Sequence, residues 1–121
     1  MRYLDGFVIP LPKRQVDTYR RLARAAGKIF KEHGALEFVA CVGDDLGLKK
    51  GMGTSFIRMA KLKRGETALF SFITYKSRAH RDRVNKRVMA DPRMAEMMEG
   101  KEMPFDVKRM AYGGFKAVVE L

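Results

Sequence analysis

The chain has 121 residues and a formal net charge of +11, from 25 Lys and Arg against 14 Asp and Glu. This length is typical of one domain, and we expect residues 1–121 to form a single domain. Apolar residues make up 46% of the chain and charged residues 32%, which is the balance of a globular protein and excludes disorder. No apolar run approaches the ~20 residues that a membrane-spanning helix requires.

The compartment is predicted from the N-terminal residues and from cysteine usage. The basic residues near the N-terminus follow the apolar stretch, so we expect no secretory signal peptide. Cys41 is the only cysteine, which excludes an intramolecular disulfide and a cysteine-based zinc site and fits a reducing compartment. We therefore expect a cytoplasmic protein. The positive charge predicts general attraction to polyanions and identifies no specific partner.

The first predicted element is a strand over residues 3–9. Alternation places Asp5 on the same face as Tyr3 and Phe7. Pro10 and Pro12 are expected to end this strand, because proline lacks the N–H donor that a central strand uses on both sides.

A long helix is predicted next, starting near Arg14 or Gln15 and ending at His33. Apolar residues recur at helical spacing along it, which predicts one buried stripe. Gly34 follows at the position where a left-handed C-terminal cap belongs. The stripe consists of Tyr19, Leu22, Ala23, Ala26, Ile29 and Phe30.

Three further strands are predicted in the middle of the chain, over residues 35–42, 55–62 and 67–75. Four glycines and four charges between residues 43 and 53 indicate a loop. The turn at residues 63–66 predicts a hairpin that joins the second of these strands to the third. The strand over residues 67–75 is apolar on both faces, which indicates a central strand covered on both sides.

The last part of the chain is predicted to contain two helices and an edge strand. Ser77 is placed as the N-cap of a helix that runs to Met89, and Asp91-Pro92 restarts a short helix that ends at Gly100. A final strand is predicted over residues 112–119. Three of its side chains are expected to face inward: Phe115, Ala117 and Val119.

This order of elements predicts a ferredoxin-like α+β domain, with an antiparallel sheet and both main helices on one face. The right-handed crossover rule then places the first strand beside the strand over residues 67–75. That central strand carries Leu69 and Ile73 on one face and Phe70 and Phe72 on the other. Because the helices cover one face alone, the other face must be buried on a second copy, a ligand or a nucleic acid.

Residues with obvious chemistry are few. His33 and His80 have no second His or Cys at metal-ligand spacing, and the serines lie in no nucleophile motif, so we expect no metal and no cofactor. Asp5 and Glu37 lie on predicted strands and could each face a cleft. Six of the nine methionines fall between Met89 and Met110, which is typical of core or interface filling, with a methionine-lined pocket as the alternative.

A nucleic-acid interpretation rests on Phe70-Ser71-Phe72-Ile73-Thr74-Tyr75, which approximates the aromatic half of an RRM signature. Together with the net charge of +11, it supports a single-stranded RNA-binding module that stacks bases on Phe70 and Phe72. Three observations oppose it. The signature lacks its opening basic residue and glycine, the preceding segment is too long, and the basic residues concentrate on the helices.

Four phrases of the chain resemble the YbaA-like family of small bacterial proteins: DGFVIPLP, KEHGALEFVACVGDD, TYKSRAHRDRVNKRVMADPRM and MPFDVKRMAYGGFK. The resemblance covers nearly the whole chain. It implies a ferredoxin-like domain of the dimeric α/β-barrel type, in which two sheets pack face to face. The family is one of unknown function, so the resemblance assigns no catalytic residue and leaves open whether the protein is an enzyme.

The leading functional hypothesis is a homodimer that binds or converts a small molecule in a cleft between sheet and helices. The arginines would suit an anionic ligand. The central strand (Leu69, Phe70, Phe72 and Ile73) would contribute either the dimer interface or the RNA-stacking surface. The candidate ligand-binding residues are His80, Arg81, Phe105, Arg109 and Tyr112. A structural or regulatory partner protein without small-molecule chemistry is the third alternative.

Overall fold

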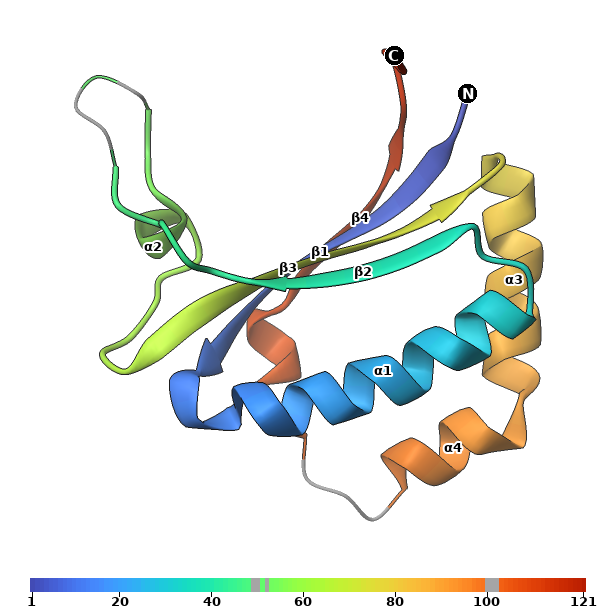
Figure 1. Ribbon diagram of the computed structural model, residues 1–121, viewed down its shortest axis with the longest axis horizontal. Helices are drawn as coiled ribbons and strands as arrows, with labels where there is room; N and C mark the ends of the chain where they lie inside the picture. The colour runs from blue at the N-terminus through green and yellow to red at the C-terminus, as the bar shows by residue number, and fades with distance from the viewer. Residues whose placement is uncertain (49–50, 52, 100–102) are drawn as a thin grey trace.

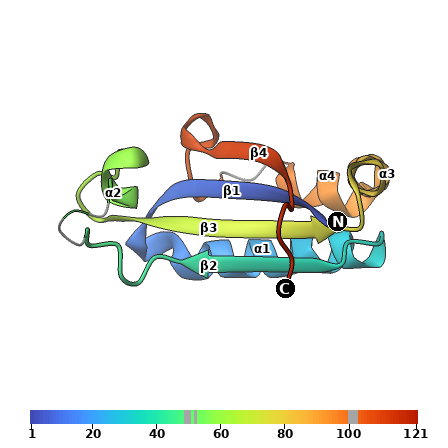
Figure 2. The ribbon, with the colours of Figure 1, turned by 90° about the horizontal axis from the view of Figure 1, so that it is seen from above.

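A four-stranded antiparallel sheet with the strand order β2-β3-β1-β4 forms the centre of the molecule (Figures 1 and 2). The structure is a computed structural model that describes residues 1–48, 51, 53–99 and 103–121. The strands are β1 (Tyr3–Pro12), β2 (Glu37–Val42), β3 (Glu66–Tyr75) and β4 (Ala111–Lys116). The helices are α1 (Val16–Glu32), α2 (Phe56–Met59), α3 (Arg78–Ala90) and α4 (Pro92–Met98), with 3-10 turns at Lys13–Gln15 and Val107–Arg109.

The helices α1, α3 and α4 all pack on one face of this sheet; Figure 1 shows α1 and α4 below the strands and α3 running down at their right-hand end. Leu69 and Ile73 of β3 are 2% and 3% exposed because they point towards these helices. Val84 and Val88 of α3 are buried against the same face, as their four-residue spacing predicts. The predicted ferredoxin-like α+β architecture with two main helices on one face is therefore confirmed.

Strand β3 is central, as its two apolar faces predict. It pairs with β1 along all ten of its residues and with β2 from Leu69 to Thr74. The position of β1 beside β3 follows the right-handed crossover rule. Both edges of β3 are therefore paired, so residues 55–62, which precede it, cannot add to it as a further strand.

The predicted strand over residues 55–62 is wrong, because residues Phe56–Met59 form the short helix α2. Ser55 caps this helix by accepting a hydrogen bond from the Arg58 N–H with its side chain. The apolar alternation of a short segment does not distinguish a strand from a helical turn. With β1 and β2 on either side, β3 offers no free edge to which residues 55–62 could add.

The prolines of β1 do not end the strand at residue 9 as predicted, since β1 continues through Pro10 to Pro12. Pairing between β1 and β4 stops at Val8, whereas pairing with β3 continues to Pro12. Beyond Val8 one side of β1 has no neighbouring strand among the described residues, so a missing N–H costs no ladder hydrogen bond there.

The last strand is shorter than predicted, and Phe115 points to the opposite side from the one predicted. β4 is an edge strand, as predicted, and ends at Lys116. Phe115 is 61% exposed and Val119 is 71% exposed, so the prediction that they face inward is wrong for the single chain. Phe115 lies on the open face of the sheet that Figure 2 views from above, with α1 behind the strands.

The helix ends follow their sequence signals. Gly34 has a φ of +115° at the end of α1, the left-handed cap that favours glycine. Ser77 accepts a hydrogen bond from His80 N–H, and Asp91 accepts one from Arg93 N–H, as predicted N-caps. The predicted helix end at Gly100 lies outside the described residues.

Within the described ranges, no helix has the length and apolar character needed to cross a membrane.

Candidate functional site

A buried ion pair joins the sheet to α3. Strand alternation places Asp5 on the helix-facing side of β1, and the first turn of α3 places Arg81 opposite it. Arg81 Nη1 lies 2.6 Å from Asp5 Oδ1, and the two side chains are 12% and 2% exposed. Arg81 also donates to Asp82 through Nε at 2.8 Å. Because removing a charged pair from water is costly, such a pair at a cavity is a candidate functional site.

Three tyrosines surround this ion pair. The Arg81 guanidinium lies over the Tyr3 ring, 4.9 Å from its centroid. Burial, together with the nearby Asp5 charge, raises the pKa of the Tyr75 hydroxyl and that of the Tyr112 hydroxyl. Both phenols therefore stay protonated at neutral pH and can donate hydrogen bonds. The Tyr75 hydroxyl lies 3.4 Å from Asn85 Oδ1 and donates to it.

Two adjoining cavities extend from this cluster between the sheet and the helices. The first, which we call the polar cavity, has a volume of about 250 Å³ and is lined by Asp5, Asn85 and Tyr112 among apolar residues. The second, the methionine cavity, has a volume of about 280 Å³ and an almost wholly apolar wall. The two cavities share four lining residues: Phe7, Phe30, Ile73 and Met110.

The methionines between Met89 and Met110 all line these two cavities. Met89 lines the polar cavity, and Met110 lines both. The four others line the methionine cavity: Met94, Met97, Met98 and Met103. Unbranched thioether side chains adapt their shape easily, so this wall can adjust to different occupants. The pocket alternative described for these methionines therefore fits the structure better than core filling alone.

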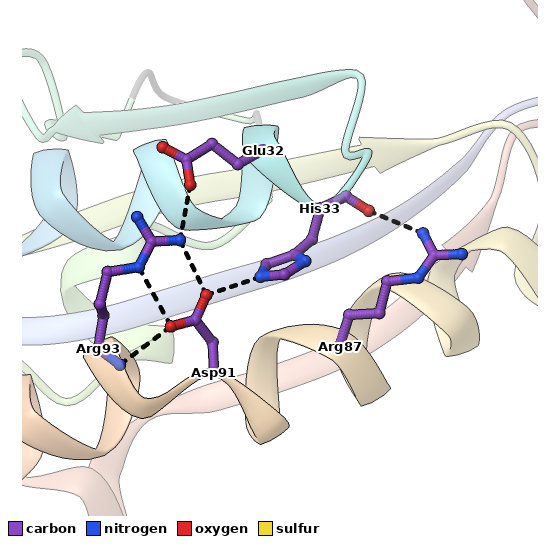
Figure 3. A network of polar contacts seen from close by, with 5 residues as sticks. All are labelled: Glu32, His33, Arg87, Asp91 and Arg93. Carbon is purple, nitrogen blue, oxygen red and sulfur yellow. Dashed lines mark hydrogen bonds and ion pairs between the residues drawn. The ribbon is translucent and has the colours of Figure 1, made fainter.

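A network of charged residues anchors α4, which carries three of these methionines (Figure 3). Asp91 lies between Arg93, at 2.8 Å, and His33 Nε2, at 2.7 Å. Hydrogen bonds from Arg93 and from His33 hold the pKa of Asp91 well below its usual range. Arg93 also contacts Glu32 at 2.6 Å, so the start of α4 is fastened to the end of α1.

A second ion pair anchors the opposite wall of the methionine cavity. Arg109 Nη1 and Nη2 contact the two carboxylate oxygens of Glu66 at 2.7 and 2.8 Å, and Nη2 also donates to the Lys61 carbonyl. This bidentate pair fastens the segment that carries Phe105 and Met110 to the start of β3.

The structure brings together two of the five predicted ligand-binding residues, Arg81 and Tyr112, at the polar cluster. Phe105 lines the methionine cavity, with its ring edge-on to Tyr19. His80 accepts a hydrogen bond from Lys76 N–H and contacts the Tyr75 ring, and it lines neither cavity. Arg109 is occupied by Glu66 and likewise lines neither. A ligand-binding role stays a prediction for all five.

Sequence reasoning missed Tyr75 and Asn85 and gave Asp5 little weight. The available signal for Asp5 was a single carboxylate on an otherwise aromatic and apolar strand face. Arg81 and Asn85 are four residues apart, which places them on one side of α3 towards that face. Over the described part of the chain, no group of three or more His, Cys, Asp or Glu side chains could bind a metal ion.

The open face of the sheet is a second candidate surface. Phe70 is 48% exposed there, and its ring lies 6.2 Å from that of Phe72. A hollow of about 540 Å³ on this face is lined by Leu4, Val8 and Phe115 together with these two rings. The strand registers put no Lys or Arg on this face within β1 to β4, while Leu69 and Ile73 lie under the helices.

The buried ion pair gives a stability prediction. Asp5→Asn leaves Arg81 buried with Asp82 as its remaining acidic partner, so we expect a loss of about 3 kcal/mol in the free energy of unfolding. Asp82→Asn removes the exposed partner of the same guanidinium and should cost less than about 1 kcal/mol. Urea unfolding of both variants at pH 7 measures the difference. Equal losses in the free energy of unfolding would show that the buried Asp5 contact stabilises the fold no more than the exposed Asp82 contact does.

The Glu66–Arg109 pair gives a pH prediction. The hydrogen bond from Arg109 lowers the pKa of Glu66 from 4.5 to about 2. A lowered pKa stabilises the fold above pH 4.5, and this contribution is lost as the pH falls to about 2. Glu66→Gln should therefore cost about 1–2 kcal/mol at pH 7, and its difference from the native protein should shrink by pH 3.

Urea unfolding at pH 7 and pH 3 checks this prediction, with Glu96→Gln on the exposed surface of α4 as the control. The control should match the native protein at both values. A difference for Glu66→Gln that stays constant between pH 7 and pH 3 would contradict the assigned cause of the pKa shift.

Comparison with known sequences places this chain in a protein family. The family model described as protein of unknown function (DUF1428) matches residues 2–107. The chain is 43% identical over 120 residues to the uncharacterised protein YbaA of Escherichia coli strain K12, covering 99% of each chain. The YbaA protein of Shigella flexneri matches with the same identity and coverage.

Among solved structures, the chain is similar to a dimeric ferredoxin-like protein from an uncultured marine organism. The two share 14% sequence identity with a TM-score of 0.51, and the match covers 100% of each chain. At this identity the likeness supports the fold alone. The match to the family model and the full-length likeness to YbaA show that the chain belongs to the DUF1428 family of proteins of unknown function.

Proposed function

We propose that this protein is a homodimer that binds a small, mainly apolar molecule between the sheet and the helices of each subunit. The observation that carries the proposal is the pair of adjoining cavities, with six methionines in their walls and the Asp5–Arg81 cluster at one end. Ligand sites are typically apolar cavities with a few converging polar groups, and this combination fits that description.

The size of the cavities supports a compact ligand. An apolar cavity of about 150 Å³ binds benzene in another protein, so a cavity of about 280 Å³ suits a molecule of two fused rings or a chain of similar volume. The apolar body would occupy the methionine cavity. A polar head at one end would reach the polar cavity, where Tyr112 and Asn85 offer hydrogen bonds.

The charge balance favours a neutral head group over the anionic one expected from the sequence. Arg81 already contacts two carboxylates, those of Asp5 and Asp82, and Arg109 is paired with Glu66. Of these charged groups only the Asp5 carboxylate lines the polar cavity, so an anionic head there would meet a like charge. A neutral carbonyl or hydroxyl could instead accept a hydrogen bond from the protonated Tyr112 phenol.

The open sheet face supports the dimer part of the proposal. Phe70 and Phe115 form an exposed apolar surface that is unusual on a monomer. A second copy can bury this surface by packing sheet against sheet, the arrangement implied by the resemblance to dimeric α/β barrels. The similar marine protein is also described as dimeric.

The RNA-binding alternative would use the same face, with Phe70 and Phe72 as stacking platforms. Single-stranded nucleic acid binding combines such platforms with a positively charged groove. The strand positions of this face contain no Lys or Arg, and the carboxylate of Glu37 is paired with Arg2, so the strands supply no positively charged groove for an RNA backbone. We therefore favour a second copy as the occupant.

Titration with two naphthalene probes tests the ligand proposal. The probes are 2-acetylnaphthalene, with a neutral carbonyl, and 2-naphthoate, of nearly the same shape with an anionic head. The chain contains no Trp, so probe fluorescence can be followed with little background from the protein. We expect the neutral probe to bind at least ten times more tightly than the anionic probe, although the net charge of +11 attracts the anion.

Matched variants on α1 locate the binding site. Ala26 lines the methionine cavity, whereas Ala25 is exposed on the same helix. Ala26→Phe fills the cavity and should abolish probe binding, and Ala25→Phe should leave it unchanged. Equal binding by both variants, or no binding of either probe to the native protein, would overturn the proposal.

A further inference from the structure

A groove of about 800 Å³ runs between α1 and the outer edge of β2, beside the methionine cavity, with which it shares Tyr19, Ala23 and Phe38. All six residues of β2 line it, and its floor contains apolar side chains such as Phe38 and Leu69. We propose that this groove is a docking site for an extended acidic segment of a partner protein, which adds to the sheet as a strand beside β2.

The edge of β2 is the first observation. β2 pairs with β3 on one side and ends the sheet on the other. Exposed edge strands present unpaired N–H and C=O groups, and natural proteins usually protect them with lysine, proline, a bulge or a covering segment. β2 has the sequence EFVACV, which contains neither lysine nor proline, and Ala40 to Val42 are exposed. Such an edge is suited to pairing with another strand.

The charge of the groove is the second observation. Four exposed cations lie along one side of α1 at spacings of four, four and three residues and line the groove: Arg20, Arg24, Lys28 and Lys31. Arg20 is paired with Asp17, and Lys31 donates to the Leu36 carbonyl. Within the part of the chain that the structure describes, neither Arg24 nor Lys28 forms an ion pair.

The acidic side chains of the groove do not neutralise these cations. Glu32 is paired with Arg93, and Glu37 is paired with Arg2 at the far end of the groove. The groove therefore offers unpaired positive charge beside an unpaired strand edge. An acidic polypeptide complements both features at once.

The strand β2 and the basic side of α1, which border the groove, have similar lengths. Six residues of strand extend roughly 20 Å, and the eleven helical steps from Arg20 to Lys31 extend roughly 17 Å. Successive side chains of an added strand would point alternately towards α1 and towards the open sheet face. Acidic residues suit the first direction and apolar residues suit the second. The expected segment is therefore about six residues long, with acidic and apolar residues in alternation.

Fluorescence anisotropy with a labelled Glu-Val-Glu-Val-Glu-Val peptide tests the proposal at low salt. The native protein should bind it more tightly than a block peptide of the same composition, Glu-Glu-Glu-Val-Val-Val. Arg24→Glu combined with Lys28→Glu should weaken binding at least tenfold. Arg83→Glu combined with Lys86→Glu, on the exposed surface of α3, makes the same change in net charge and should weaken binding less than threefold.

Backbone pairing is tested with two further peptides, one methylated on the valine amides and the other on the glutamate amides. Alternate N–H groups of a strand point in opposite directions, so methylation of one set should abolish binding and methylation of the other should be tolerated. Equal behaviour of the two methylated peptides would overturn the strand-addition proposal. Equal weakening of peptide binding by the two charge-reversal variants would show that binding depends on net charge alone. That result would also overturn the proposal.

Two other occupants would also overturn the proposal, and the same variants identify them. If Arg24→Glu with Lys28→Glu abolishes binding of an oligouridine while the acidic peptide fails to bind the native protein, the groove serves a nucleic acid. If that variant changes the oligomeric state, the groove is occupied by a second copy of this chain. Selective loss of peptide binding, with oligomeric state and ligand-probe binding intact, supports the proposal.

Discussion

The two apolar faces of β3 are the constraint on which the rest of the structure depends. One face of β3 contributes Leu69 and Ile73 to the core, and α1, α3 and α4 all assemble on that side. Their arrangement leaves the two cavities between sheet and helices, with Asp5 at one end. The other face presents Phe70 to solvent in a single chain. The candidate ligand site and the candidate dimer interface thus lie on opposite sides of one strand.

Much of the fold could be predicted from the sequence because its signals were local and consistent. The apolar periodicity of α1, the glycine at residue 34 and the caps at Ser77 and Asp91 each indicated one structure, and each was confirmed. The segment over residues 55–62 was mispredicted because its outcome depends on pairing elsewhere. Only the register of β3 with both β1 and β2 reveals that no edge is left for it.

The candidate site was less predictable, because it is assembled from residues far apart in the chain. Asp5 and Arg81 are 76 residues apart, and nothing in either local sequence identifies the other as its partner. The methionines were visible as a cluster between Met89 and Met110, but core packing and a cavity wall have the same composition. The choice between them depends on the volume left between α1, α4 and the sheet, which is a property of the packed structure.

The most direct test of the account is the molecular mass in solution, measured by sedimentation equilibrium or native mass spectrometry at micromolar concentration. The account predicts a native protein of twice the 13.8 kDa chain mass. Phe70→Lys, on the open face, should give a folded monomer, and Ala25→Lys, on the exposed surface of α1, should remain a dimer. A native protein at the mass of one chain would contradict the claim that a second copy covers the open face of β3.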